Sequence, residues 1–251
     1  MTKTLEGKVA LVTGGSRGLG AAIAARFADL GADVAISYVA SEAKAAEVVA
    51  ALKAKGVRAL AIRSDQGDPS AAKTLIDRVV SQLGKLDVLV NNAAVAVQGH
   101  RIDDPAADTA ALDQQWMTNV LGAVATTRAA AQRLTDGGRI VFIGSGLGTR
   151  VAFAQATEYA ATKAALVGYA RGASRDLGPR NITVNVVNAG AMMTDMGVAS
   201  ADKLPPGLID LLSIKRMGTV EEVAGAVAYL VGPDAGYITG AELDISGGYQ
   251  A

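Results

Sequence analysis

The sequence predicts an α/β fold in which one doubly wound parallel sheet of seven strands is covered by helices on both faces. Short runs of β-branched residues alternate with longer, Ala-rich segments of helical period along nearly the whole chain, a pattern typical of this class. No linker rich in Ser, Pro or charge divides the chain, and it contains no internal repeat. The 251 residues, 50% of which are hydrophobic, are enough to bury a core. One domain over residues 1–251 is therefore expected.

The β-branched runs place the seven strands, and the segments between them place six helices. The predicted strands span residues 8–13, 33–38, 58–62, 86–90, 139–143, 183–187 and 241–245. The predicted helices span residues 18–30, 41–55, 69–83, 107–134, 157–177 and 220–231. Two irregular stretches, residues 95–109 and 191–215, follow the C-terminal ends of the fourth and sixth strands. Ligands bind at that edge of an open α/β sheet, so both stretches are predicted substrate loops.

The composition restricts the partners and the chemistry. Lys and Arg number 24, as do Asp and Glu, so no net charge attracts nucleic acid or anionic lipid, and the predicted partner is a small molecule. There is no cysteine and a single histidine, His100, which excludes disulfides, thiolate ligands and paired-histidine metal sites; no metal is expected. No apolar run approaches the roughly 18 residues of a membrane span. We expect a cytoplasmic protein without membrane contact.

A glycine-rich turn joins the first strand to the first helix. Gly14, Gly18 and Gly20 stand in the sequence Thr-Gly-Gly-Ser-Arg-Gly-Leu-Gly, which runs directly into an Ala-rich helix. Glycine permits close approach of the backbone to a phosphate, and the unpaired amides at a helix N-terminus favour negative charge. The spacing differs from the common G-x-G-x-x-G pattern and lacks the lysine of a P-loop. The turn therefore predicts a phosphate or dinucleotide site.

The same residues also match the G-x-S-x-G pattern of a hydrolase nucleophile elbow, with Ser16 as the nucleophile. Such a serine needs a histidine that follows the acid late in the chain, whereas His100 lies early. A serine hydrolase using Ser16 stays an alternative that the sequence makes unfavourable.

Tyr159 and Lys163 stand four residues apart, so on a helix they project from one face. A free phenol has a pKa of about 10, and a neighbouring ammonium lowers it toward the range useful for acid–base catalysis; a half-buried helical pair without chemistry is the alternative. Ser145 follows the fifth strand at the ligand-binding edge, where its hydroxyl either polarises a carbonyl or bonds the local turn. Asn119, a poor helix former in a helical run, indicates a local backbone disturbance or a buried hydrogen bond.

Together these residues resemble the short-chain dehydrogenase/reductase family, from about residue 5 to residue 248. The glycine turn matches the family's dinucleotide-binding turn, and residues 91–94 match its Asn-Asn-Ala-Gly stretch. The family's catalytic tetrad matches Asn119, Ser145, Tyr159 and Lys163. The chain is similar to ketoreductases of the 3-oxoacyl-(acyl-carrier-protein) reductase type. The resemblance implies a single-domain Rossmann-type fold and a homotetramer, or alternatively a dimer.

The resemblance further implies an NADPH-dependent carbonyl reductase that converts a ketone to a secondary alcohol, reversibly. Tyr159 would donate a proton to the carbonyl oxygen as hydride arrives from the nicotinamide, and Ser145 would hold that oxygen. Lys163 would bind the nicotinamide ribose and lower the pKa of Tyr159. Asn119 would anchor a water that links Lys163 to solvent. A 3-oxoacyl thioester or a general ketone is the expected substrate; a catalytically silent, NADP-binding regulator is the alternative.

The end of the second strand favours NADP(H) over NAD(H). An NAD-binding member needs an acid there for the adenosine ribose, but the strand ends with Ser37 and Tyr38. Arg17 is placed to meet a 2′-phosphate, to which Ser37 and Ser41 add hydroxyls, and the resemblance assigns Asp65 to the adenine. The residues expected to contact the cofactor are Gly14, Ser16, Arg17, Gly18, Leu19, Gly20, Ser37, Tyr38, Ser41, Asp65, Gln66, Asn91, Ala93, Tyr159, Lys163, Gly190, Met192 and Thr194. Those expected to contact the substrate are Val95, Leu147, Val151, Phe153 and Met196.

The sequence departs from the family pattern at three places. Ala94 stands where the family has glycine, Ala189 stands where it has proline, and the tetrad serine and tyrosine are one residue further apart than usual. The extra residue is expected within residues 149–157, where it reshapes the substrate wall. Arg150, in the same stretch, is either a handle for an acidic group on the substrate or a surface arginine.

Overall fold

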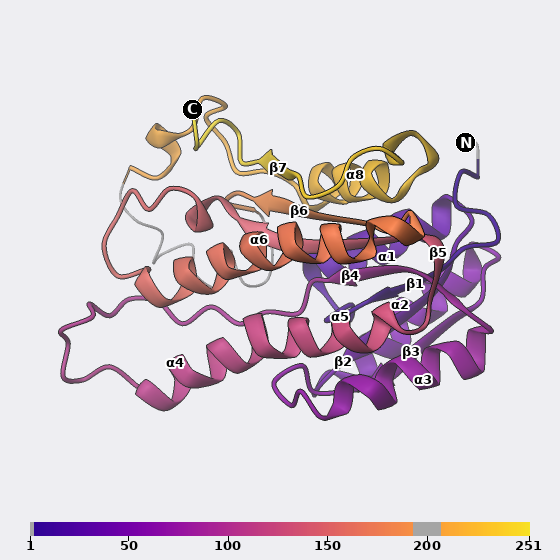
Figure 1. Ribbon diagram of the computed structural model, residues 1–251. Helices are drawn as coiled ribbons and strands as arrows, with labels where there is room; N and C mark the ends of the chain where they lie inside the picture. The colour runs from indigo at the N-terminus through magenta and orange to yellow at the C-terminus, as the bar shows by residue number, and fades with distance from the viewer. Residues whose placement is uncertain (1–2, 193–206) are drawn as a thin grey trace.

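The computed structural model describes residues 3–192 and 207–251, which contain one sheet of seven parallel strands (Figure 1). The strands are β1 (Val9–Val12), β2 (Asp33–Tyr38), β3 (Ala59–Arg63), β4 (Leu86–Asn91), β5 (Leu134–Ser145), β6 (Thr183–Ala189) and β7 (Glu242–Ile245). Their order in the sheet is β3-β2-β1-β4-β5-β6-β7, and neighbouring strands are parallel. The order reverses between β1 and β4, as in doubly wound folds, so the predicted fold class is confirmed.

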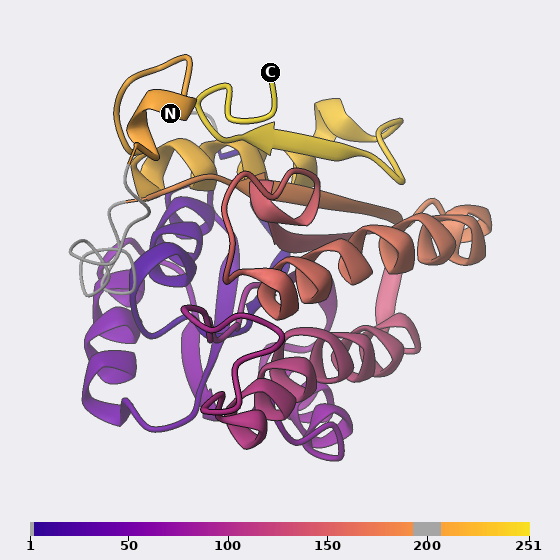
Figure 2. The same ribbon diagram turned by 90° about the vertical axis from the view of Figure 1, so that its left-hand side faces the viewer.

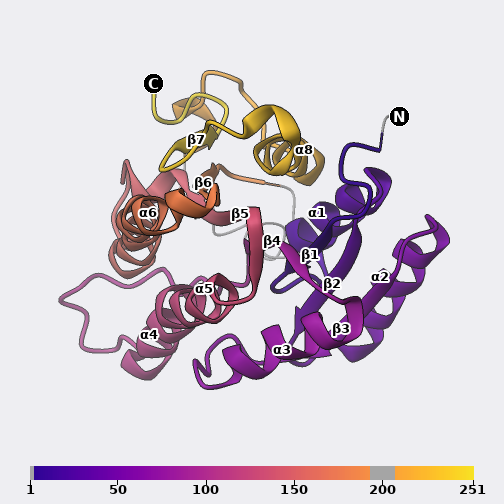
Figure 3. The same ribbon diagram turned by 45° about the vertical axis from the view of Figure 1, so that its right-hand side comes forward.

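Helices cover both faces of the sheet, as Figure 3 shows. They are α1 (Gly18–Asp29), α2 (Glu42–Ala54), α3 (Ala71–Leu83), α4 (Thr109–Trp116), α5 (Ala123–Ala131), α6 (Thr157–Leu177) and α8 (Val220–Val231). Buried side chains of α1, α2 and α8 form one apolar core with the sheet, and those of α3, α5 and α6 form a second core on the opposite face. Within residues 3–192 and 207–251, no helix combines the length and the apolar character needed to cross a membrane.

The two cores explain why β1 is apolar at every position. Along β1, Ala10 and Val12 pack in the core with α1 and α8, whereas Val9 and Leu11 pack in the core with α3 and α5. Consecutive side chains on a strand point to opposite faces, so a strand buried on both faces needs apolar residues throughout. β1 is therefore buried on both faces, and the glycine turn follows it at the carboxyl edge of the sheet.

Most elements lie where the sequence predicts them, and the predicted bounds of β2, α6 and α8 agree with the structure. The prediction of one helix over residues 107–134 is wrong. The structure has α4, a π-helical segment at Met117–Gly122 and then α5, and residue 134 begins β5, which extends the predicted strand at both ends. The Ala-rich run carries helical propensity to this point, but Leu134 is buried and pairs with Leu86 of β4, so tertiary packing decides its conformation.

Candidate active site

A cleft of about 490 Å³ lies at the carboxyl edge of the sheet, and residues at or after the ends of β1 to β6 line it. The structure brings together in this lining most of the residues predicted from the sequence. They are Gly14, Ser16, Arg17, Gly18, Leu19, Gly20, Ser37, Tyr38, Ser41, Asp65, Gln66, Ala93, Val95, Ser145, Tyr159, Lys163, Gly190 and Met192. Lining residues that the sequence did not assign to a site are Val39, Ala40, Ser64, Asn92, Ala94, Gln114, Thr118, Ile143, Gly144 and Ala189.

Close contacts exclude side chains from the glycine turn. Gly14 has a φ of +66°, and a Cβ on it would lie 2.9 Å from Cα of Ala93. A Cβ on Gly20 would lie 2.5 Å from the carbonyl oxygen of Gly14. α1 begins at Gly18 with no side-chain cap and no acidic residue in its first turn, so no capping side chain competes for its N-terminal amides. A pyrophosphate requires such a cradle, and the residues present fit a dinucleotide.

Thr13 and Asn92 tie the ends of β1 and β4 together. Thr13 Oγ1 accepts hydrogen bonds from the backbone N–H groups of Asn92 and Ala93, both at 3.0 Å, and Asn92 Nδ2 donates to the carbonyl oxygen of Thr13 at 2.8 Å. The structure does not bring Asn91 to the cleft: its side chain is buried and donates to Thr127 Oγ1 at 3.0 Å. Neighbouring side chains on a strand point to opposite faces, so Asn92 belongs to the site and Asn91 to the interior.

Two carboxamides hold the segment that follows β4. Asn119 Oδ1 accepts from the N–H of Val95 and Asn119 Nδ2 donates to its C=O, each at 2.9 Å, and the same Nδ2 donates to Thr162 Oγ1 at 3.2 Å. Gln115, one turn earlier, accepts from the N–H of Val97 at 2.6 Å. Asn119 is buried in the π-helical segment, so the backbone disturbance and the buried hydrogen bond that its sequence context indicated are both present. The sequence prediction missed Gln115, whose signal is a second carboxamide four residues before Asn119.

Ser145, Tyr159 and Lys163 meet in the cleft. Ser145 ends β5, and its hydroxyl is a hydrogen-bond partner of the Tyr159 phenol. Lys163 Nζ donates to the carbonyl oxygen of Ile143 at 2.9 Å and lies 5.6 Å from the centre of the Tyr159 ring. α6 presents the tyrosine and the lysine on one face, because residues four apart are neighbours on a helix. The arrangement gathers two hydroxyls and an ammonium where they can bind and protonate a carbonyl oxygen.

Burial controls the protonation of both ionisable groups. It raises the pKa of Tyr159 to about 12, which the hydrogen bond to Ser145 partly offsets, and it lowers the pKa of Lys163 to about 8. The expectation that Lys163 lowers the pKa of Tyr159 is not met in this structure, because desolvation of the phenol dominates and the ammonium bonds to Ile143. At neutral pH the phenol is therefore protonated, which suits a proton donor, and the lysine is mostly charged.

The stability of the protein is expected to change with pH as Lys163 titrates. The lysine has a pKa of 10.5 when unfolded and about 8 when folded, so between these values the unfolded state binds more protons. The free energy of unfolding should therefore rise with pH above about 8, by up to roughly 1.4 kcal/mol per pH unit. Above pH 10, Tyr159 acts in the opposite direction, because its folded pKa is raised.

Denaturant unfolding of the wild type and of Lys163→Met between pH 7 and 9.5 measures this effect. The wild type should gain stability relative to the variant as the pH rises, since only the wild type contains the titrating ammonium. A constant difference between the two proteins over this range would show that the folded pKa of Lys163 is not lowered.

The end of β2 brings no carboxylate into the cleft, whose lining there runs from residue 37 to residue 41. Arg17 is exposed at the start of α1, and Ser41 makes no capping bond to α2, so both side chains are available to a ligand. Ser37, by contrast, is buried, and its Oγ accepts from the N–H of Gly14 at 3.3 Å. This bond holds the glycine turn against β2, and it leaves the O–H of Ser37 to donate to a phosphate, so the predicted phosphate contact of Ser37 stays a prediction.

Polar side chains line the end of the cleft at which the resemblance places the adenine. Asp65 Oδ1 accepts from the N–H of Gly67 at 2.8 Å, and Gln66 Nε2 is buried with no hydrogen-bond partner among the described residues. Gln114 and Thr118 line the same cleft from α4 and the π-helical segment. A buried unpaired donor is unfavourable unless a ligand or water satisfies it, so this end of the cleft fits a nitrogen heterocycle.

The segment after β5 lies outside the cleft, contrary to the sequence prediction. Leu147, Val151 and Phe153 do not line the cleft, and Val151 is 51% exposed. Thr194 and Met196 lie outside the described residues. Of the predicted substrate contacts, the structure therefore places only Val95 in the lining as far as the described residues extend.

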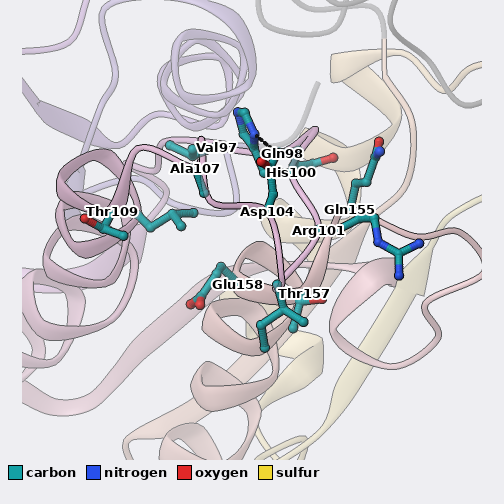
Figure 4. Close-up of a pocket in the computed structure, with 12 residues that line it drawn as sticks. Val97, Gln98, His100, Arg101, Asp104, Ala107, Thr109, Gln155, Thr157 and Glu158 are labelled. Carbon is teal, nitrogen blue, oxygen red and sulfur yellow. Dashed lines mark hydrogen bonds and ion pairs between the residues drawn. The ribbon is translucent and has the colours of Figure 1, made fainter.

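A second, smaller pocket of about 180 Å³ lies between the loop after β4 and the start of α6 (Figure 4). His100 lines it, and His100 Nδ1 lies 2.9 Å from Asp104 Oδ2. Ser16 lines the other cleft, so the structure does not bring the single histidine of the chain to the serine that a hydrolase would need. Gln155, in the stretch expected to hold the extra residue, has a φ of 72°, and its carbonyl oxygen accepts from the N–H of Gly99 at 3.1 Å. This bond joins the two loops around the pocket.

Known proteins match the chain over nearly its whole length. The family model described as Enoyl-(Acyl carrier protein) reductase matches residues 14–250. The cyclic-di-GMP-binding biofilm dispersal mediator protein of Escherichia coli (strain K12) is 42% identical over 245 residues, which are 98% of each chain. The 3-oxoacyl-(acyl-carrier-protein) reductase FabG of Staphylococcus aureus (strain Mu50) is 38% identical over 247 residues, which are 96% of this chain and 97% of that one.

A solved structure shows the same fold with a nucleotide. The crystal structure of a short chain dehydrogenase from Burkholderia cenocepacia J2315 in complex with NADP superposes with a TM-score of 0.92 at 47% identity, covering 99% of this chain and 100% of that one. Its NADP supports the cofactor predicted from the sequence. From the family match, the relatives and the shared fold, we conclude that the chain belongs to the short-chain dehydrogenase/reductase family.

Proposed function

We propose that the protein is an NADPH-dependent carbonyl reductase, which converts a ketone to a secondary alcohol and catalyses the reverse oxidation. The observation that carries the proposal is the presence of Ser145, Tyr159 and Lys163 in the same cleft as the glycine turn. The cleft combines a dinucleotide cradle with a proton donor, and reduction of a carbonyl by a nicotinamide requires both.

NADPH, when bound, supplies the hydride, and this chain supplies its binding site. The glycine turn and the N-terminus of α1 hold the pyrophosphate in the proposed complex. Arg17 and Ser41 meet the 2′-phosphate, because both line the cleft, Arg17 at the start of α1 and Ser41 just after β2. Asp65 and Gln66 meet the adenine, where the unpaired Gln66 amide finds an acceptor. Residues after β4 and β6, including Ala93, Gly190 and Met192, enclose the nicotinamide end of the cleft.

The proton path uses the residues at the end of β5 and the start of α6. Ser145 and Tyr159 donate hydrogen bonds to the carbonyl oxygen of the substrate, and Tyr159 gives its proton to that oxygen. Lys163 binds the nicotinamide ribose, from where its ammonium stabilises the phenolate left behind. Asn119 bonds to the backbone of Val95, which lines the cleft. In this proposal it also holds one water that connects Lys163 with solvent.

The proposed substrate is a 3-oxoacyl thioester or another ketone. The similarity to the Staphylococcus reductase supports the thioester, whereas the description of the family model names reduction of an enoyl group. Ser145 and Tyr159 share a hydrogen bond and so can bind one oxygen between them, which favours reduction at a carbonyl carbon. An enoyl thioester is therefore the comparison substrate.

Consumption of NADPH by the purified protein tests the proposal. The panel contains an acetoacetyl thioester, a β-keto ester, an aryl ketone, a cyclic ketone and a crotonyl thioester, each assayed with NADPH and with NADH. We expect turnover of at least one ketone, faster with NADPH, and none of the crotonyl thioester. Binding of NADPH without turnover of any ketone would reject the reductase.

Arg17→Ala is expected to weaken NADPH binding about 10- to 100-fold and to leave NADH binding unchanged. A charge-assisted hydrogen bond contributes about 1.5–3 kcal/mol, and only NADPH carries the 2′-phosphate. Titration of the fluorescence of each reduced cofactor measures both dissociation constants. Arg175→Ala removes the same charge from an exposed position on α6 and is the control. An equal loss for NADH in Arg17→Ala would show that Arg17 does not read the phosphate.

A catalytically silent, NADP(H)-binding regulator is the second candidate function. The observation that favours it is the 42% identity to a relative named as a cyclic-di-GMP-binding mediator of biofilm dispersal. Its signature would be tight NADPH binding with no turnover in the panel above. The presence of all four tetrad residues in this chain favours the reductase.

We further propose that the protein assembles as a homotetramer, or alternatively as a dimer, and acts in the cytoplasm. The assembly rests on the usual behaviour of the family, and the absence of cysteine suits a reducing compartment. Light scattering on a size-exclusion column measures the mass of the assembly.

A further inference from the structure

The segment that leaves the active site after Ser145 is bound to the C-terminal part of the chain. Residues 146–152 include a 3-10 helix at Gly146–Gly148 and then run beside residues 242–251, which follow β6 by more than fifty positions. Figure 2 shows the C-terminal segment, in yellow, above the loop that follows β5. These contacts explain why Val151 and its neighbours do not line the cleft.

Arg150 and Tyr249 form the main contact, which we call the C-terminal brace. Tyr249 is 4% exposed, and its phenol oxygen accepts from the backbone N–H of Ala152 at 3.1 Å. Arg150 Nη1 donates to the carbonyl oxygen of Tyr249 at 2.5 Å, and the guanidinium carbon lies 5.5 Å from the centre of the Tyr249 ring. Arg150 is therefore engaged with its own chain, and it is not the handle for an acidic substrate that the sequence left open.

Two further contacts hold the same segment. Thr149 Oγ1 donates to Glu242 Oε2 at 3.5 Å, and Glu242 in turn accepts from Arg171 Nη2 at 2.6 Å. A Cβ on Gly146 would lie 3.1 Å from Cδ1 of Tyr249, so the tyrosine ring packs directly against the backbone that follows β5. Residues 146–152 thus contact the C-terminal part of the chain at Gly146, at Thr149 and Arg150, and at Ala152.

The C-terminal brace is connected to the active site through Ser145. Ser145 Oγ accepts from the N–H of Leu147 at 3.2 Å, so the orientation of the hydroxyl depends on the position of the 3-10 helix. The same C-terminal stretch also reaches the opposite wall of the cleft: a Cβ on Gly190 would lie 2.6 Å from Cα of Ser246. The C-terminal residues therefore pack between the walls that follow β5 and β6.

We propose that Tyr249 and Arg150 are positioning residues, which hold residues 146–152 so that the Ser145 hydroxyl stays aligned with Tyr159 and the carbonyl oxygen. The proposal rests on the reductase function proposed above. Neither residue lines the cleft; each acts through the backbone of residues 146–152.

Tyr249→Phe tests the brace, because it keeps the ring and removes only the oxygen that accepts from Ala152. We expect backbone amides of residues 147–152 to exchange hydrogen about 3- to 10-fold faster in this variant. We expect kcat/KM for the ketone to fall by about the same factor and KM for NADPH to stay unchanged. Tyr237→Phe, at a fully exposed position in the same C-terminal region, is the matched control and should behave as the wild type.

Arg150 gives a second, graded test. Arg150→Lys keeps a cation near the Tyr249 ring and a donor for its carbonyl oxygen, whereas Arg150→Met removes both. We expect the lysine variant to retain more of the ketone kcat/KM and more of the exchange protection than the methionine variant. The oligomeric mass of each variant is measured alongside, so that a loss of assembly is recognised.

Exchange in residues 147–152 that equals the wild-type rate in Tyr249→Phe would overturn the brace. An equal loss of kcat/KM for the ketone and of NADPH affinity would also overturn it, since that pattern indicates a general loss of structure. A wild type that turns over no ketone would reject the proposed reductase instead. The exchange measurement needs no turnover, so it decides the brace separately.

Discussion

Tyr159→Phe is expected to lower kcat for ketone reduction about 10²- to 10⁴-fold and to leave the dissociation constant of NADPH nearly unchanged. The phenol oxygen lies in the cleft and shares a hydrogen bond with Ser145, so it is the atom that gives the proton in the proposed reaction. Phenylalanine keeps the ring and removes the donor. Initial rates at saturating ketone measure kcat, and the fluorescence of bound NADPH measures its affinity.

Tyr169→Phe is the matched control for this prediction. Tyr169 lies further along α6, and its ring packs edge-on against Phe142 with 5.9 Å between the ring centres. Loss of its hydroxyl should leave kcat within about twofold of the wild type, because Tyr169 does not line the cleft and its hydroxyl bonds to Arg128 instead. A kcat for Tyr159→Phe that equals that of the control would contradict the role of Tyr159 as proton donor.

Lys163→Met is expected to lower kcat/KM for the ketone by about 10²-fold or more while the melting temperature stays close to the wild-type value. Lys163 is 3% exposed, and its amine bonds to the carbonyl oxygen of Ile143. Methionine keeps much of the stem and removes the charge that binds the ribose and stabilises the phenolate. The loss of one hydrogen bond is offset, at least in part, by the removal of a desolvated ammonium.

Steady-state kinetics and a thermal melt on the same preparation separate the two effects. Lys53→Met, at an exposed position on α2, controls for the change in net charge. A kcat/KM in Lys163→Met close to that of the wild type would reject the proposed role of the lysine. A variant that loses activity only because it unfolds would show a large fall in melting temperature, which would contradict the expectation that this residue serves function more than stability.

The sequence predicts those features that depend on local pattern. Strands buried on both faces have continuous apolar runs, so the sequence predicts where the strands lie and how they alternate with helices along the chain. A Tyr and a Lys four residues apart on a helix must share a face, and the glycine turn must follow β1. The sequence therefore also predicts that Tyr159, Lys163 and the glycine turn belong to the site.

The features that the sequence predicts poorly depend on tertiary contacts. Asn91 and Asn92 are alike in the sequence, and only the pleat of β4 decides that Asn92 faces the cleft. Leu147, Val151 and Phe153 are predicted substrate contacts, but the structure leaves all three outside the cleft lining, and the same segment bonds at Ala152 to a tyrosine far along the chain.

The pKa shifts of Tyr159 and Lys163 also depend on tertiary structure, which the sequence does not show. A positive charge four residues from a phenol predicts a lowered pKa, yet burial raises the pKa of Tyr159 to about 12 and lowers that of Lys163 to about 8. Desolvation depends on how deeply the fold buries each group, and the spacing of residues along a helix carries no such information.

Transfer of deuterium from NADPH to a ketone is the most direct test of carbonyl reduction by this protein. The purified protein is incubated with NADPH that carries deuterium at C4 of the nicotinamide, together with the best ketone of the panel, and the alcohol is analysed by mass spectrometry and NMR. We expect one deuterium at the carbinol carbon, formed at the rate of NADPH oxidation and almost absent with Tyr159→Phe. Tight binding of NADPH with no labelled alcohol from any ketone would contradict the proposed reductase and favour a regulator.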